Sequence, residues 1–410
     1  MLPARYARYL IATVTSTALL AACSNGPRGT PLLPSGSTSG GVGQRSVTET
    51  VIYSFKGGSD GLDPYASLIV VHGRLYGTTY YGGPGCYSTS YQGCGTVFRM
   101  TKSGAKSVLY SFGDGSRGYY PLDGAYPGGS LVNVRDAFYG ITVSGGANGD
   151  GIVYRITKSG AEAVLHSFAG GSDGVTPVGN LINVGGTLYG TTVIGGTSRN
   201  GTVFGITPSG TERVVHSFGS GSDGSFPDAG LINLGGSLYG TTANGGTKNI
   251  GTVFRITKSG KETVLYSFGT SASDGNSPRA SLINVGGALY GTTEDGGAYE
   301  YYGTVFSITR SGKEQVLHSF GSGSDGAYPA ASLIDVGGTL YGTTLEGGTN
   351  KYGTVFSITK SGTETVLHSF AGGSDGAYPS ASLIDVGGTL YGATENGGTH
   401  DDGTVFSIVP

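Results

Sequence analysis

The stretch that decides the fold is ASLIDVGGTLYGTTLEGGTNKYGTVFSITKSGTETVLHSF, residues 331–370. It contains four short runs rich in β-branched and aromatic residues, namely ASLIDV, TLYGTT, GTVFSIT and ETVLHSF. Gly-Gly, a longer variable loop and Ser-Gly separate them. Runs of this kind between glycine-containing turns are typical of strands joined as hairpins, not of helices. The stretch therefore predicts four antiparallel strands, which together make one propeller blade.

This unit recurs along the chain at a nearly constant period. Segments like LYGTT, GTVF and VLHSF each occur seven times. An Asp-Gly-x-x-Pro motif also occurs seven times, with steps of 63, 50, 50, 51, 51 and 50 residues between its aspartates. These aspartates are Asp60, Asp123, Asp173, Asp223, Asp274, Asp325 and Asp375. The period of about fifty residues predicts one repeat architecture and not several separate domains.

The two ends of the repeat region indicate a closed ring. The region begins with a lone fourth strand, 49–55, and ends with a third strand, 403–408, that has no fourth strand after it. If the first strand completes the last blade, the ring has no open edge. An open solenoid gives no reason for such complementary ends. We therefore predict an all-β fold, a seven-bladed β-propeller of four-stranded antiparallel blades closed by strand 49–55.

The repeats resemble the GloVer-type tandem repeat family, a choice-of-anchor, β-propeller-like group. Its signature is LYGTT, a Gly-Gly loop, GTVF, a Ser-Gly turn and LYSF, and such motifs fill this chain from Val51 to Ile408. The resemblance implies a repeat fold and members with different surface anchors. It implies no activity, because no reaction is established for the family as a whole.

The start of the chain has the features of an export signal. Arg5 and Arg8 precede an apolar stretch that is too short to span a bilayer comfortably and that ends in Leu-Ala-Ala before Cys23. Small residues before a cysteine resemble a bacterial lipobox, in which Cys23 would be lipidated. The alternative is an ordinary signal peptide with an incidental cysteine. Ser24 follows the cysteine, which by the usual sorting pattern favours an outer membrane.

These features divide the chain into three parts. We expect a lipoprotein-type signal peptide over 1–22 and a Gly/Ser/Pro-rich tether over 23–48 that begins at the lipidated cysteine. The propeller then covers 49–410. The expected location is the cell envelope, with lipid anchoring at the outer membrane or cell surface and no other contact with the membrane.

Cys86 and Cys94 remain as a pair within the loop GCYSTSYQGC. In an exported protein such a pair is expected to form a disulfide. A metal site there lacks further soft ligands nearby. Because the closed loop is short, we expect the bond to stiffen the loop more than the fold.

Composition excludes one large class of partners. The net charge is −3, so the chain has neither the basic footprint of a nucleic-acid-binding protein nor a polybasic surface for acidic lipids. We expect extracellular carbohydrate or protein as the partner, no nucleic acid, and a monomer.

The long, variable loops are expected to share one face of the propeller, and the tight turns the other. The seven Asp-Gly-x-x-Pro motifs lie in such loops. Their structural interpretation is that Asp accepts hydrogen bonds from its own turn, Gly supplies an unusual φ, and Pro fixes the approach to the strand. The alternative is a ring of carboxylates near the channel mouth that could hold calcium, although one carboxylate per blade is thin coordination. No other cofactor is indicated.

The candidate ligand site lies where the repeat is irregular. Two insertions fall between Gly83 and Asp123, one on each side of the fourth strand of the first blade. Tyrosine rings are amphipathic and suit carbohydrate or protein contacts; alternatively, they only cover the insertions' own surface. We select the following residues of these insertions as the candidate site: Tyr87, Tyr91, Arg117, Tyr119 and Tyr120.

No catalytic set stands out, and neither an HExxH nor a P-loop pattern occurs. Histidine alternates with tyrosine at one outer-strand position, which we interpret as packing; these residues are His166, His216, His318 and His368, with Tyr53, Tyr110 and Tyr266 in other blades. The sequence therefore favours a non-catalytic binding or adhesion propeller. The alternatives are a hydrolase or lyase acting on extracellular polymer at the channel mouth, and an inert spacer in the envelope.

Overall fold

The computed structural model describes residues 47–86, 93–113, 121–219, 221–299, 301–321 and 323–410. Met1–Arg45 and Ser46–Pro410 form separate units, and all described residues belong to the second. Within the described ranges, no helix has the length and apolar character needed to cross a lipid bilayer.

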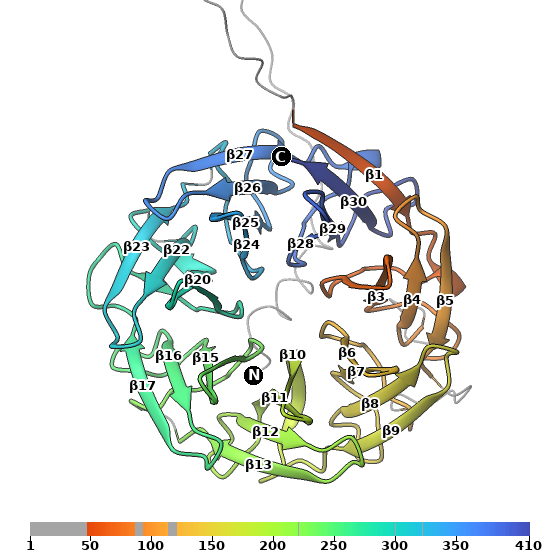
Figure 1. Cartoon of the computed structure of the whole chain (residues 1–410), viewed down its shortest axis with the longest axis horizontal. Coiled ribbons are helices and arrows are strands. Elements are labelled where there is room, and N and C mark those ends of the chain that lie inside the picture. Colours follow the sequence, from red (N-terminus) through yellow and green to blue (C-terminus); the bar gives the residue numbers. More distant parts are fainter. Residues whose placement is uncertain (1–46, 87–92, 114–120, 220, 300, 322) are drawn as a thin grey trace, which may run out of the picture. The chain divides into compact units, whose positions relative to one another are not determined.

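Seven four-stranded antiparallel sheets surround a central axis as blades (Figure 1). From the innermost strand outward, blades 1 to 3 consist of β2 (Ile69–Val71), β3 (Arg74–Thr79), β4 (Thr96–Met100) and β5 (Lys106–Ser111); β6 (Val132–Val134), β7 (Ala137–Thr142), β8 (Ile152–Thr157) and β9 (Glu162–Ser167); and β10 (Val175–Val184), β11 (Thr187–Ile194), β12 (Thr202–Ile206) and β13 (Glu212–Ser217).

Blades 4 to 7 repeat the same order. They consist of β14 (Ile232–Leu234), β15 (Ser237–Thr242), β16 (Thr252–Ile256) and β17 (Glu262–Ser267); β19 (Ile283–Val285), β20 (Ala288–Thr293), β22 (Thr304–Ile308) and β23 (Glu314–Ser319); β24 (Ile334–Val336), β25 (Thr339–Thr344), β26 (Thr354–Ile358) and β27 (Glu364–Ser369); and β28 (Ile384–Asp385), β29 (Leu390–Thr394), β30 (Thr404–Val409) and β1 (Thr48–Ser54). A short pair, β18 (Gly275–Asn276) and β21 (Asp295–Gly296), and two 3-10 turns, η1 (Gly58–Asp60) and η2 (Gly373–Asp375), lie in the loops. The predicted seven-bladed fold is confirmed.

The N-terminal strand closes the ring, as predicted. β1 pairs antiparallel with β30, with Thr48 opposite Val409 and Ser54 opposite Thr404. It is the outer strand of blade 7 and lies at the circumference beside β30 (Figure 1). Nearer the axis, the Ser382 amide donates to Ser67 Oγ at 2.9 Å, which joins the inner parts of blades 7 and 1.

The core lies between neighbouring blades. The phenylalanine that follows each outer strand packs edge-to-face on an aromatic ring in the third strand of the next blade, for example Phe55 on Phe98 with centroids 5.4 Å apart. The other six pairs are Phe112–Tyr154, Phe168–Phe204, Phe218–Phe254, Phe268–Phe306, Phe320–Phe356 and Phe370–Phe406. All of these rings are fully buried. Each pair contributes about 0.5–1.5 kcal/mol beyond its buried area, so the seven joints together stabilise the ring.

The glycine of LYGTT leaves space for the aromatic side chain of the neighbouring third strand. In blade 6, a Cβ at Gly342 would lie 2.7 Å from the tip of the Phe356 ring on the neighbouring strand. No side chain fits at such a distance. The two motifs LYGTT and GTVF are therefore halves of one packing arrangement.

The Asp-Gly-x-x-Pro motif joins each blade to the one before it. The Asp63 amide, just before Pro64, donates to the Asp402 carbonyl at 3.0 Å, and a Cβ at Gly403 would lie 2.5 Å from the proline ring. The same amide–carbonyl bond recurs in the pairs Tyr126–Cys94, Thr176–Asp150, Phe226–Asn200, Ser277–Ile250, Tyr328–Tyr302 and Tyr378–Tyr352. These contacts agree with the structural interpretation of the proline in this motif.

Both kinds of long loop meet on one face, as expected, and we call it the loop face. Bridges such as Leu62 to Tyr81 and Ala125 to Ser144 connect the loop that enters a blade with the loop between its second and third strands. The expected Cys86–Cys94 disulfide is present in the second kind of loop in blade 1. Both cysteines are buried beside Phe112, so the bond also belongs to the core between blades 1 and 2.

Candidate functional site

The sequence-predicted ligand residues lie outside the described part of the chain. Tyr87 and Tyr91 belong to 87–92, and Arg117, Tyr119 and Tyr120 belong to 114–120. Cys23 also precedes the described residues. The described residues that border these segments nevertheless form a distinct surface.

Four tyrosines gather on the loop face where blades 1 and 2 meet, and we call them the tyrosine cluster: Tyr65, Tyr80, Tyr81 and Tyr126. Tyr80 stacks on Tyr126 with centroids 5.3 Å apart and planes at 20°. It meets Tyr81 edge-on at 4.8 Å and Tyr65 at 5.9 Å. All four side chains are half-buried, so part of each ring surface faces solvent.

The backbone beneath the cluster is held by hydrogen bonds. The Tyr80 amide donates to the Asp63 carbonyl at 2.8 Å, and the Tyr126 amide donates to the Cys94 carbonyl at 2.7 Å. The disulfide therefore fixes the loop segment at Cys94 whose carbonyl accepts the hydrogen bond from Tyr126. Rigid support of this kind lowers the entropy lost when a ligand binds.

Among the described residues, tyrosines in other sectors of this face form pairs, Tyr302 with Tyr328 at 6.0 Å and Tyr352 with Tyr378 at 5.8 Å, whereas the cluster joins four. At the positions of Tyr65 and Tyr80, blade 3 has Val178 and Val193, and blade 6 has Ala330 and Leu345. Sequence reasoning concentrated on the insertions and missed Tyr65 and Tyr126. Both tyrosines are next to the proline of the Asp-Gly-x-x-Pro motif. The residues at these two positions differ between blades, whereas the motif itself is constant, and this variation could have identified them.

The same variable positions carry buried charges in other sectors. Arg279 of blade 5 forms ion pairs with Asp228 of blade 4 and, at 2.6 Å, with Glu294. At the seam between blades 7 and 1, burial and the nearby Glu395 raise the pKa of Asp63 well above its usual value. Glu395 is only 5% exposed. The loop face is thus chemically different from blade to blade.

The motif aspartates lie elsewhere, at the places where one outer strand ends and the next begins. Outer strands follow one another around the circumference (Figure 1), and we call each meeting point a junction. Tyr53 donates from its hydroxyl to Asp60 at 2.8 Å, and Tyr110 to Asp123 at 2.7 Å. The expectation of a carboxylate ring at the channel mouth does not match this position, because these side chains bind outer strands.

Each junction has a third side chain, which comes from the beginning of the next outer strand. In six junctions it is a glutamate whose pKa is raised to about 7, mainly by burial, with the charge of the neighbouring aspartate adding to the effect; these are Glu49, Glu162, Glu212, Glu262, Glu314 and Glu364. In the seventh it is Lys106, whose ammonium lies 2.8 Å from Asp60. Burial lowers the pKa of Lys106, while Asp60 opposes that shift.

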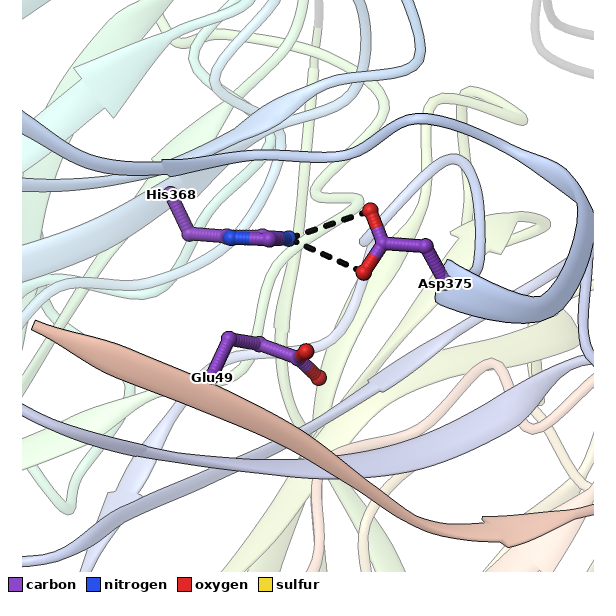
Figure 2. Close-up of side chains that lie close together, drawn as sticks. All are labelled: Glu49, His368 and Asp375. Atoms are coloured by element: carbon purple, nitrogen blue, oxygen red, sulfur yellow. Dashed lines mark hydrogen bonds and ion pairs between the residues drawn. The ribbon is translucent and has the colours of Figure 1, made fainter.

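Histidine replaces tyrosine at four junctions. His368 Nε2 lies 3.2 Å from both carboxylate oxygens of Asp375, and Glu49 approaches the pair from β1 (Figure 2). The ring also packs edge-on against Phe370 at 4.8 Å. The packing interpretation of histidine is therefore correct but incomplete. The contact with aspartate was missed, although Tyr–His exchange itself signals a shared hydrogen-bonding role.

Two clusters in the described residues bring three metal-ligating groups together. They are Glu49 with His368 and Asp375, and His166 with Asp173 and Glu212, and in each the ligand atoms all lie within 4.8 Å of one another. His166 Nε2 is likewise 3.2 Å from both oxygens of Asp173.

The seven blades, the inter-blade joints and the strand that closes the ring define the chain as a repeat β-propeller protein. The family model of the Gloeobacter/Verrucomicrobia repeat matches residues 86–302 and 270–410, and the chain belongs to this family. No curated protein matches the chain.

Two solved structures share features of the fold. A puromycin-hydrolysing peptidase of Mycobacterium tuberculosis is 10% identical, with a TM-score of 0.49 over 80% of this chain and 48% of the peptidase. The chain thus spans about half the length of that protein. A putative TolB from Agrobacterium tumefaciens is 11% identical, with a TM-score of 0.37 over 74% of this chain and 94% of the other. At these TM-scores neither likeness bears on activity.

Proposed function

We propose that this protein is a non-catalytic binding or adhesion propeller that holds extracellular carbohydrate or protein on the loop face of blades 1 and 2. The observation that carries the proposal is the tyrosine cluster, in which four half-buried aromatic rings meet on the loop face, whereas the tyrosines that meet in other described sectors form pairs. Tyrosine gives a large contact area, a hydroxyl for hydrogen bonding and a small loss of side-chain entropy.

The sequence-predicted residues extend this surface in the proposal. Both insertions begin or end beside the cluster, because Cys94 contacts Tyr126 and Pro121 leads into the loop that carries Tyr126. Tyr87, Tyr91, Arg117, Tyr119 and Tyr120 are therefore proposed to contribute to the same ligand surface. Insertions in a regular repeat commonly lie on its binding face.

The proposal includes the location of the protein. Cleavage before Cys23 and lipidation of that residue would tether the propeller to the envelope, with the outer membrane or cell surface as the proposed site. Two or three acyl chains give lasting attachment, whereas one gives only reversible binding.

The second candidate function, a hydrolase or lyase of extracellular polymer, has one observation in its favour. Asp63 and Glu395 bring two carboxyl groups together at the seam, and the raised pKa of Asp63 suits a general acid. Against it, Glu395 is buried, and a glycosidase needs both groups to reach the substrate. Binding therefore remains the preferred function.

The experiment is a glycan array and a pull-down with the full chain, followed by affinity measurements on variants. Tyr80→Ala and Tyr126→Ala should each weaken binding by about 1–3 kcal/mol without loss of folding. Tyr378→Ala is the matched control, since Tyr126 and Tyr378 occupy the same motif position with φ of 63° and 59°. Equal losses in the variant and in the control would place the ligand away from the cluster. Polymer cleavage that Asp63→Asn abolishes would favour the enzyme instead.

A further inference from the structure

Most junctions place two carboxyl groups side by side, and two negative charges so close together repel each other. Six of them place a glutamate beside the motif aspartate, and in each the glutamate Oε1 is buried without a hydrogen-bond partner among the described residues; these are Glu49, Glu162, Glu212, Glu262, Glu314 and Glu364. Two facing carboxyl groups require a proton or a cation between them. The seventh junction supplies its own cation, the Lys106 ammonium.

Two junctions differ from the other four in having a nitrogen ligand aimed at both aspartate oxygens. His368 and His166 are equidistant, at 3.2 Å, from the two oxygens of their aspartates. Both aspartates end the same loop sequence, Ala-Gly-Gly-Ser-Asp. In both loops the two glycines adopt a left-handed φ, 72° and 54° for Gly170 and Gly171. That turn lets the Ala169 amide hold one aspartate oxygen at 2.7 Å.

The other two histidine junctions keep the amide contact, from Gly219 to Asp223 and from Gly321 to Asp325, but their histidines do not bond both aspartate oxygens. His216 contacts Asp223 through one oxygen at 3.3 Å, and His318 contacts Asp325 through one oxygen at 3.3 Å. Both of these loops read Gly-Ser-Gly-Ser-Asp. The junctions of His216 and His318 therefore serve as internal controls for those of His166 and His368.

We propose that Glu49, His368 and Asp375 form a zinc-class divalent metal site, and that His166, Asp173 and Glu212 form a second. One imidazole nitrogen with carboxylate oxygens is a donor set that suits zinc, whereas calcium takes six to eight oxygens. Tetrahedral zinc with bonds of about 2.0–2.1 Å places ligand atoms about 3.3 Å apart. The observed His–Asp distance of 3.2 Å fits this geometry, and a carboxylate oxygen of Glu49 lies within 4.8 Å of the other two ligand atoms.

Access to the two sites is open. The side chains of His368 and Asp375 are each 22% exposed, and those of His166 and Asp173 are 21% and 20% exposed. An ion can therefore enter from solvent, and water can complete its coordination. These residues are separate from the tyrosine cluster, so the metal proposal does not depend on the proposed ligand.

The test uses the full chain after treatment with a chelator, titrated with zinc chloride by calorimetry and in competition with a chromophoric chelator. We expect two zinc ions per chain. His368→Tyr and His166→Tyr should each remove one, and the double variant both. Tyrosine is the natural residue at this position in three junctions, at Tyr53, Tyr110 and Tyr266, so the substitution suits the fold. His318→Tyr is the matched control and should leave two zinc ions bound.

Thermal unfolding of the double variant checks that it folds. If it does not fold, Glu49→Gln with Glu212→Gln keeps both histidines and should still lose both ions. The proposal is overturned if the wild-type chain binds no zinc, if the folded double variant keeps its zinc, or if His318→Tyr loses as much as His368→Tyr.

Discussion

At the scale of single residues, the end of each outer strand shows how two side chains can share one structural task. Tyr53 and His368 occupy equivalent positions, pack on the next phenylalanine, and bring a polar atom to the motif aspartate. Tyrosine can only hydrogen-bond there at neutral pH, whereas histidine can also ligate a metal. The exchange keeps the packing and changes the chemistry of the junction.

Replacement of Tyr154 should increase the stability of the protein. It occupies the place that phenylalanine fills in the other blades, and its buried hydroxyl has no hydrogen-bond partner among the described residues. Burial raises its pKa further above an already alkaline value. We expect Tyr154→Phe to stabilise the protein by about 1 kcal/mol, because it removes an unsatisfied polar group.

Urea unfolding of the two proteins measures this difference. Phe204→Tyr in blade 3 is the reciprocal control and should destabilise by a similar amount, since it buries a hydroxyl at the same place in another blade. A Tyr154→Phe protein less stable than wild type would reveal a hydroxyl partner for Tyr154.

The candidate site was only partly predictable at this scale. The sequence pointed to blades 1 and 2 because insertions and tyrosines coincide there, and the tyrosine cluster lies in that sector. Tyr65 and Tyr126 are about sixty residues apart in the chain. Their approach depends on how adjacent blades pack side by side, which a repeat pattern does not reveal.

At the scale of elements, the order of the repeated segments, and the points at which the repeat region begins and ends, predicted the strand order and the closure of the ring almost completely. Apart from β10 in blade 3, the innermost strands are shorter than predicted: ASLIDV in blade 6 yields only Ile334–Val336 as β24. The preceding residues bond to the next blade instead, since the Ser332 amide donates to Ser382 Oγ at 2.9 Å. Hydrophobic pattern alone does not distinguish a partner within the sheet from one in a neighbouring blade.

Deleting Thr48–Ser54 should destabilise the whole propeller. The deletion removes the outer strand of blade 7 and leaves β30 as an open edge. We expect the free energy of unfolding to fall by about 5 kcal/mol or more, comparable with the total stability of a typical domain. Chemical denaturation measures this loss.

A peptide of residues 47–56 added in trans supplies the control. It should restore part of the lost stability, whereas a peptide with Val51 and Tyr53 changed to aspartate should not. Unchanged stability after the deletion would mean that pairing between β1 and β30 contributes little to the ring.

At the scale of the whole molecule, the repeated junctions give the stability a definite dependence on pH. Each junction glutamate has its pKa raised from 4.5 to about 7 in the folded protein. Between these values the unfolded chain releases a proton that the folded chain keeps. Stability therefore falls as pH rises from about 4.5 to about 7 and is then constant with respect to these groups. Partial exposure of the glutamates reduces the size of the effect.

Glu314→Gln tests this dependence at a junction that has tyrosine in place of histidine. Glu314 faces Asp274 and Tyr266. In the presence of a chelator, the variant should show a smaller fall in stability between pH 5 and pH 8 than the wild type, measured by urea unfolding. Asp335→Asn is the matched control, because this carboxylate is exposed and Asn occupies the same position in four blades that include blade 3 at Asn183. Equal slopes in Glu314→Gln and wild type would contradict the shift.

The strand that closes the ring also fixes the order of events when the protein is made. β1 is the first strand of the propeller to be synthesised, and β30, its partner, is the last. At typical translation rates of about 5–20 residues per second, roughly 20–70 s separate the two. The other six blades are built from strands that are near neighbours in the chain, whereas β1 has no partner for its edge until β30 is present. A polypeptide interrupted before Thr404 therefore cannot complete blade 7, so ring closure requires that β30 has been made.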